Sequence, residues 1–162
     1  MIMRLIALNG AMNSKKEWVA RKLAENSDCI WIKPYTDRPR LAVDYDDDEM
    51  IHLNYPKLSY KMQREVPLAE VEINNYRYVF FENQLKAGYC VLIADDRVID
   101  YLKNNWDDEL ITVKIHSNNE EPSKRFQLKD DMFDIVFNVD NDEFDELEEL
   151  VCDIYHYVEG QV

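Results

Sequence analysis

A glycine and a lysine near the start of the chain are spaced as they are in loops that hold phosphate groups. Gly10 and Lys16 match the first glycine and the lysine of the pattern G-x-x-x-x-G-K-[ST]. In that pattern backbone N–H groups surround the phosphates, the lysine reaches the outer phosphates and the hydroxyl binds magnesium. The stretch GAMNSKKE, residues 10–17, is therefore a candidate phosphate-binding loop.

Two positions of this stretch depart from the pattern, and a third differs from many such loops. Lys15 replaces the second glycine and Glu17 replaces the serine or threonine. A lysine crowds a tight turn, and a carboxylate can bind magnesium but also places negative charge beside the phosphates. Asn13, where many such loops have a further glycine, is a milder change because asparagine tolerates a left-handed backbone. Taken alone, the stretch fits an ordinary strand-to-helix turn equally well.

The segments around this stretch predict a strand, a loop and a helix. The apolar run at 1–8 is typical of a strand covered on both faces. Asn13 or Ser14 can cap a helix that starts near Lys15 and ends near Asn26. Further strands are predicted at 29–32, 89–94, 110–115 and 133–138, and further helices at 81–87, 97–105 and 143–157. This alternation predicts an α/β fold with three layers and a mainly parallel sheet.

The middle of the chain has a different pattern. The predicted segments are a loop at 35–48, one or two helical turns at 56–63 and a β-hairpin at 65–81. Asn74 and Asn75 separate the two alternating halves of the hairpin and predict its turn. Gly88 follows the helix predicted at 81–87 and has the chemistry of a C-terminal cap.

Size and composition predict one compact domain. The chain has 162 residues, of which 46% are hydrophobic. It shows no membrane span and no signal peptide, so a cytoplasmic protein without a membrane partner is expected. The cysteines are widely spaced in apolar contexts, which predicts buried thiols at Cys29, Cys90 and Cys152. The histidines are isolated from one another and from the cysteines, so no metal site is expected.

The charge is strongly acidic and unevenly placed. The net charge is -14, and residues 120–162 contain fourteen acidic side chains against three basic ones. Such a surface disfavours direct binding of nucleic acid, whose phosphates need lysine and arginine. It is either a solvated, solubilising face or a surface that docks onto a basic protein. The candidate docking residues are Asp46, Asp47, Asp48, Glu143, Asp145, Glu146, Glu148 and Glu149.

Motifs in order along nearly the whole chain resemble the guanylate kinase family of nucleoside-monophosphate kinases. ALNGAMNSKKEWVARKL resembles the family's first strand, loop and helix, YTDRPR its TTRxPR motif, and VDY the Asp/Tyr motif that follows. PLAEVEINNYRY, LKAGYCVLIADD and FDIVFNVDNDEFDELEELV resemble the base-reading segment, the strand ending in a catalytic-site aspartate, and the closing strand and helix. The resemblance implies one guanylate-kinase-like domain over residues 1–162, with an acceptor-site subdomain at about 35–80.

The resemblance also implies roles for individual residues. Donor phosphates would be bound by Gly10, Asn13, Lys15 and Lys16, with Lys16, Asp96 and Arg125 at the catalytic centre. The acceptor nucleotide would be bound by Arg38, Arg40, Tyr45, Tyr78 or Tyr76, and Glu70 or Glu72. Without the resemblance, these tyrosines fit packing at a sheet edge and the two glutamates fit the solvent face of a strand. An active enzyme would require ATP and magnesium.

The family's lid is shortened here. Between Ile115 and Phe133 stands only HSNNEEPSKRFQLKDDM, with Lys124 and Arg125 as candidate cations. Because phosphoryl transfer depends on cations that neutralise developing charge, this loss and the altered loop predict little or no kinase activity. The leading hypothesis is a pseudokinase whose acidic surface binds or inhibits a basic partner, such as a DNA-handling protein of a host, by mimicking nucleic acid. The alternative is a divergent kinase acting on GMP or dGMP. The short chain also suits a phage protein.

Overall fold

The computed structural model describes residues 3–11, 14–26, 28–40, 50–86, 88–117, 127–139 and 144–160. The chain divides into two compact units. The first unit comprises residues 1–31 and 87–162, and the second comprises residues 32–86. The sequence-based division into one domain with a subdomain at about 35–80 stays a prediction.

The first unit contains a five-stranded sheet in the order β2-β7-β1-β8-β9. The strands are β1 Met3–Gly10, β2 Cys29–Trp31, β7 Gly88–Ile93, β8 Glu109–Ser117 and β9 Ile135–Val139. Every neighbouring pair is parallel, as the alternation of strands and helices predicted. β1 is central, and its apolar residues from Leu5 to Leu8 are buried, as expected for a strand covered on both faces.

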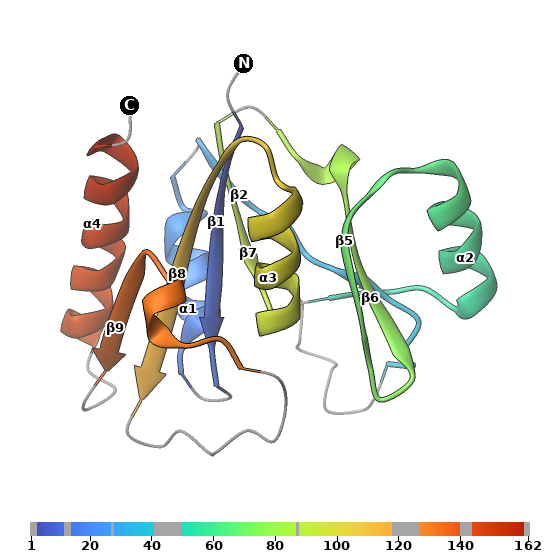
Figure 1. Cartoon of the computed structure of the whole chain (residues 1–162), viewed down its shortest axis with the longest axis horizontal. Helices are drawn as coiled ribbons and strands as arrows, with labels where there is room; N and C mark the ends of the chain where they lie inside the picture. The colour runs from blue at the N-terminus through green and yellow to red at the C-terminus, as the bar shows by residue number, and fades with distance from the viewer. Residues whose placement is uncertain are drawn as a thin grey trace. The chain divides into compact units, whose positions relative to one another are not determined.

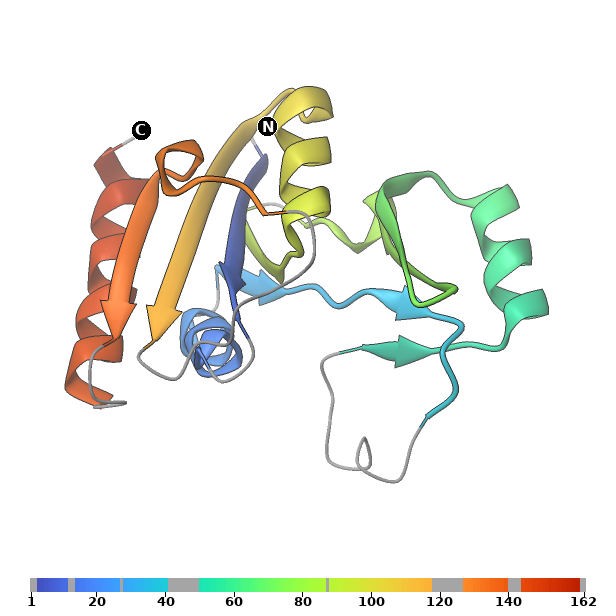
Figure 2. The same ribbon diagram turned by 60° about the horizontal axis from the view of Figure 1, so that its bottom comes forward.

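Helices lie on both faces of this sheet, which confirms the three layers. α1 (Lys16–Leu23) and α4 (Phe144–Gly160) cover one face, and α3 (Asp96–Asn105) lies on the other (Figure 1). α4 buries a stripe at helical spacing, Leu147, Leu150, Ile154 and Val158, in a core cluster that also contains Ile6 and Leu8 of β1, and α4 packs against α1 and β9. In Figure 2 the arrowheads of β1, β8 and β9 point to one edge of the sheet, and α1 is seen end-on beside the arrowhead of β1. None of the described helices is long and apolar enough to cross a membrane.

The second unit is built around an antiparallel hairpin. Its four-stranded sheet has the order β4-β3-β6-β5, with β3 Tyr35–Thr36, β4 Ile51–His52, β5 Pro67–Ile73 and β6 Tyr76–Phe81. Asn74 and Asn75 both have positive φ, 53° and 69°, as a two-residue hairpin turn requires. α2 (Tyr55–Arg64) is longer than predicted, and the side chain of Asn54 caps it by accepting a hydrogen bond from the Lys57 N–H at 3.1 Å.

Two predicted elements of the chain are wrong. Residues 35–48 begin with a strand rather than a loop, because Tyr35 and Thr36 pair with β6. The helix predicted at 81–87 is not formed by the described residues 81–86, where η2, a single 3₁₀ turn at Glu82–Gln84, is the only helical element. The Gln84 carboxamide closes this turn, because it accepts a hydrogen bond from the Phe81 N–H and donates one to the Lys33 carbonyl. Gly88 therefore caps no helix.

Gly88 instead allows a close approach between two backbone segments. It has a φ of +102°, and a Cβ added there would lie 2.7 Å from the Asp28 carbonyl oxygen. The Tyr89 N–H donates to the same carbonyl at 2.9 Å. A glycine is required at this position because both the backbone angle and the space exclude a side chain.

The cysteines divide into two buried thiols and one exposed thiol. Cys29 and Cys90 are buried, as predicted, but Cys152 is exposed on α4, so its predicted burial is wrong. The helical stripe explains this, because Cys152 falls between the buried positions Leu150 and Ile154. Burial, assisted by the neighbouring Cys90, raises the pKa of the Cys29 thiol to about 12.

This arrangement predicts selective thiol chemistry. At pH 8 we expect Ellman's reagent to modify one thiol of the native protein rapidly and all three only after unfolding, because the thiolate is the reactive form. The Cys152→Ser variant should lose the rapid phase and keep the other two slow thiols. Rapid modification of a second thiol in the native protein would contradict the burial of Cys29 and Cys90.

Candidate phosphate-binding site

The candidate loop joins the end of the central strand to the start of α1. β1 ends at Gly10 and α1 begins at Lys16. Lys15 occupies the N-cap position with φ 67° and ψ 20°, a left-handed backbone. This is the conformation for which phosphate-binding loops use a glycine, and a non-glycine residue adopts it at a cost of about 1–2 kcal/mol. Lys15 thus adopts the backbone conformation that a glycine usually has at this position of the loop.

The ammonium of Lys16 is held at the start of the same loop. Its Nζ donates to the carbonyl oxygens of Gly10 at 3.0 Å and Ala11 at 3.4 Å. The Glu17 carboxylate lies 3.9 Å from this nitrogen. The positive charge therefore stands over the loop, where a phosphate could replace the two carbonyl oxygens as hydrogen-bond acceptor.

Ser14 is turned into the loop and does not cap α1. It is fully buried, its N–H donates to the Ala11 carbonyl at 3.1 Å, and its Oγ has no hydrogen-bond partner among the described residues. The expectation that Ser14 caps the helix is wrong, because Lys15 takes the N-cap position and contributes no side-chain cap. A helix leaves its first N–H groups without partners inside the helix, so the start of α1 favours an anion.

Gly10 leaves no room for a side chain. A Cβ at this residue would overlap the Ser14 hydroxyl and lie 2.9 Å from the Ile115 carbonyl oxygen on β8. We expect Gly10→Ala to lower the free energy of unfolding by about 1–3 kcal/mol, measured by urea denaturation. In a Ser14→Gly background the penalty should shrink, because only the Ile115 contact remains. An equal penalty in both backgrounds would contradict the packing of Ser14 against Gly10.

A buried polar network lies directly beside the loop. The Asn9 Nδ2 donates to Asp96 Oδ1 at 2.9 Å and to the Ala94 carbonyl at 2.8 Å, and Asn9 Oδ1 accepts from Lys114 Nζ at 2.8 Å. Asp96 Oδ2 accepts from the Leu128 N–H at 2.7 Å. Asn9, Asp96 and Lys114 are only 4%, 9% and 6% exposed. The network thus places together the ammonium of Lys114 on β8, the amide of Asn9 near the end of β1 and the carboxylate of Asp96 at the start of α3.

Chain topology positions this network. Asn9 and Lys114 are register partners in the parallel β1–β8 pair, one step before Gly10 and Ile115. Asp96 begins α3 just after β7, and the Asp95 side chain caps that helix by accepting from the Arg97 N–H at 2.9 Å. Sequence reasoning selected Asp96 but missed Asn9 and Lys114. The one signal for Lys114 was a lysine inside the apolar run LITVKI.

The second unit holds the residues implied for an acceptor nucleotide. The Arg38 N–H donates to Thr36 Oγ1 at 3.1 Å, and the Arg38 carbonyl lies 2.7 Å from His52 Nδ1. Tyr78 is the register partner of Thr36, and Thr36 is the partner of His52, so their side chains share one face of the sheet. Arg38 and Tyr78 are half-buried, and Arg40 is exposed.

The two candidate base-reading glutamates lie on the other face of this hairpin. Glu70 pairs with Val79 and Glu72 with Arg77, whereas Tyr78 pairs with Val71. Because neighbouring residues of a strand alternate between faces, Glu70 and Glu72 point away from the face that carries Tyr78 and Tyr76. Both glutamates are exposed. The structure therefore joins the Arg38 backbone to Thr36, the register partner of Tyr78, and it does not bring either glutamate to the face of Tyr78.

The comparisons with known proteins bear on the fold. No protein-family model matches the chain, and no curated protein matches it. Among solved structures, the guanylate kinase from Anaplasma phagocytophilum superposes with a TM-score of 0.69 and 11% sequence identity, covering 99% of this chain and 86% of that one. The chain has a guanylate-kinase-like fold. The fold inferred from the sequence motifs is confirmed, and at this identity the likeness shows the fold alone.

Some predicted site residues of this guanylate-kinase-like chain lie outside the described residues. They are Asn13, Tyr45, Asp46, Asp47, Asp48, Arg125 and Glu143, together with most of the shortened lid. On α4, Asp145, Glu148 and Glu149 are exposed and Glu146 is half-buried. The described part of the candidate site therefore consists of the loop with Lys15, Lys16 and Glu17, and the network of Asn9, Asp96 and Lys114.

Proposed function

We propose that this protein binds the phosphates of a nucleotide at the loop of residues 10–16 and transfers phosphoryl groups slowly or not at all. The observation that carries the proposal is the position of Lys16, whose ammonium is held by the Gly10 and Ala11 carbonyls beside the left-handed Lys15. A nucleotide-kinase-like scaffold supports it. The ammonium and the helix dipole at the start of α1 both favour negative charge, which suits the triphosphate of ATP or GTP.

Weak transfer follows from the residues around the loop. Glu17 stands where the hydroxyl that binds magnesium belongs, and its carboxylate is 3.9 Å from the Lys16 ammonium. A negative charge there opposes the charge that develops on the transferred phosphoryl group. The acceptor in this proposal is a purine nucleoside monophosphate such as GMP or dGMP, bound by the Arg38 and Arg40 guanidinium groups, whose planar fork matches phosphate.

The proposal is tested by measuring nucleotide binding first and kinase turnover second. Isothermal titration with ATP, GTP, GMP and dGMP should show saturable binding of at least one nucleotide, and Lys16→Ala should weaken triphosphate binding at least tenfold. Lys22→Ala is the matched control, because Lys22 lies on the same helix and contacts Trp18 and Glu25 rather than the loop. A coupled assay should give less than about 0.1 turnovers per second, below the range of kinases. The absence of any nucleotide binding would overturn the proposal, and turnover above about 1 per second would establish the kinase alternative.

A second candidate function is docking of α4 onto a basic protein surface. Its supporting observation is the exposed set Asp145, Glu148, Glu149 and Asp153 on a helix without a basic residue in its last turn. Complementary charge would give fast, salt-sensitive association. A DNA-handling protein should release double-stranded DNA on adding this chain at low salt, and Glu148→Lys/Glu149→Lys should abolish the effect. Affinity that does not change between 50 and 300 mM salt would rule out nucleic-acid mimicry.

A further inference from the structure

Kinases with a phosphate-binding loop normally place magnesium beside that loop. A serine or threonine hydroxyl after the lysine and an acidic residue after a neighbouring strand hold the metal. Here the first donor is replaced by Glu17, whose carboxylate is 3.9 Å from the Lys16 ammonium. The second donor would be Asp96, but its Oδ1 accepts from Asn9 and its Oδ2 from the Leu128 N–H.

The chemistry of this donor set does not fit magnesium. Magnesium requires near-ideal octahedral geometry and usually keeps several water molecules. Asp96 is 9% exposed and both of its oxygens already serve as hydrogen-bond acceptors, which leaves little room for a hydrated ion. Within the described ranges, no group of three or more histidine, cysteine, aspartate or glutamate side chains could hold a metal ion. The site thus lacks the ligands that the fold family normally supplies.

A side-chain cation is present instead. Lys114 is 6% exposed, and its Nζ donates to Asn9 Oδ1 at 2.8 Å, next to the amide nitrogen that binds Asp96. The other described contact of this ammonium is the ring of Phe133, 5.8 Å away. A lysine ammonium has three N–H donors, and Asn9 accepts from one of them. Burying such a charge is costly unless it has a partner, and the link from this ammonium to the Asp96 carboxylate runs only through Asn9.

Ser14 gives an independent indication that a ligand occupies the loop. Its Oγ is buried inside the loop against Gly10 and has no partner among the described residues. A hydroxyl in this state is destabilising unless some acceptor, such as a phosphate oxygen, reaches it. Ser14 and Lys16 thus place two donors at Gly10, and Lys114 places a third donor on the side chain of the preceding residue, Asn9.

We infer that the loop binds its phosphate ligand without a divalent cation, and that Lys114 supplies the positive charge that magnesium supplies in ordinary kinases. The inference rests on the proposed function of the loop. It follows that metal-free ATP or GTP, with its full negative charge, is the ligand form that this site selects. A magnesium-bound nucleotide carries two fewer negative charges and offers less to the three donors.

The experiment is isothermal titration of the wild-type protein with ATP and with GTP, each in EDTA and in 5 mM magnesium chloride. We expect the Kd in EDTA to be lower than the Kd in magnesium. A Kd in magnesium that is equal to or lower than the Kd in EDTA would overturn the inference and leave the proposed function standing. No binding in either buffer would overturn the proposed function and the inference with it. This comparison requires no variant, so it decides the matter even if a lysine variant does not fold.

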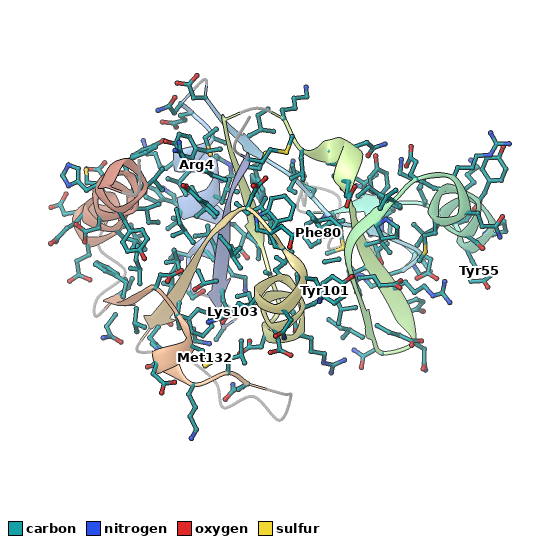
Figure 3. All side chains as sticks on the ribbon, turned by 45° about the horizontal axis from the view of Figure 1, so that its top comes forward. Arg4, Tyr55, Phe80, Tyr101, Lys103 and Met132 are labelled. Atoms are coloured by element: carbon teal, nitrogen blue, oxygen red, sulfur yellow. The ribbon has the colours of Figure 1, made fainter. Side chains whose placement is uncertain are left out.

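A matched pair of lysine variants tests the role of Lys114. Lys114→Met should weaken ATP binding in EDTA at least tenfold. Lys103→Met is the control, because Lys103 is exposed on α3 and donates to the Met132 carbonyl (Figure 3). Thermal unfolding of both variants establishes that they are folded at the titration temperature. Unchanged ATP binding by folded Lys114→Met would overturn the role of Lys114.

Discussion

Replacing Asp96 with alanine should lower the free energy of unfolding by about 3–5 kcal/mol. Asp96 is the buried carboxylate of a network that also contains Asn9 and the Lys114 ammonium. Its removal leaves the Leu128 N–H without its acceptor and takes away the carboxylate that Asn9 links to the buried Lys114 ammonium. Removing one partner of a buried ionic network is among the most destabilising single changes known. Urea denaturation monitored by circular dichroism measures the loss.

The neighbouring aspartate provides the control. Asp95 caps α3 through the Arg97 N–H and is not part of the buried network, so Asp95→Ala should cost only about 1 kcal/mol. The double variant Asp96→Leu/Lys114→Met removes both charges, and we expect it to be at least 1 kcal/mol more stable than the sum of the two single changes indicates. The network would be contradicted if Asp95→Ala and Asp96→Ala lowered the free energy of unfolding equally. It would also be contradicted if the effect of the double variant equalled the sum of the effects of its two single changes.

The elements that sequence reasoning located correctly carry strong local signals. The apolar runs of β1 and β7 are long enough to identify buried parallel strands, and α4 carries its apolar residues at helical spacing. The turn of the β5–β6 hairpin is marked by Asn74 and Asn75, both of which tolerate positive φ. In each case the residues that determine the element lie within a few positions of one another.

The errors arose where distant residues determine the local structure. The segment before Gly88 reads as a helix, but Gln84 binds the Lys33 carbonyl and Gly88 lies against the Asp28 carbonyl. β3 is only two residues long, and its pairing with β6 is what makes it a strand. Cys152 has apolar neighbours in the sequence, yet the helix turns it outward. Local patterns contain none of these constraints.

In the candidate site, too, residues that are close in the sequence were predicted and residues that are distant in the sequence were missed. The spacing of Gly10 and Lys16 identified the loop, because its residues are consecutive. Asn9 and Lys114 are 105 positions apart and become neighbours only through the register of β1 and β8. A lysine within an apolar strand usually indicates a solvent face. β8 has a neighbouring strand on each side and helices on both faces of its sheet, so Lys114 is buried.

Replacing Glu17 with glutamine should tighten the binding of metal-free ATP about tenfold. The Glu17 carboxylate lies 3.9 Å from the Lys16 ammonium and therefore competes with an incoming phosphate for that charge. Opposite or like charges at such separations near a protein surface interact strongly enough to change affinity by this factor, and salt weakens the effect. Glutamine keeps the size of the side chain and removes only the charge. Titration in EDTA at 50 and 300 mM salt measures the gain and its salt dependence.

Glu17→Gln should lower the stability of the protein although it tightens ATP binding. Glu17 lies in the first turn of α1, where a negative charge interacts favourably with the helix dipole, so Glu17→Gln should unfold slightly more easily than the wild type. Glu25→Gln is the control, because Glu25 is exposed beyond the end of the same helix and pairs with Lys22. It should leave ATP affinity unchanged. Tighter binding with lower stability in Glu17→Gln alone would show that Glu17 limits phosphate binding, whereas unchanged or weaker binding would mean that the ligand does not approach Lys16.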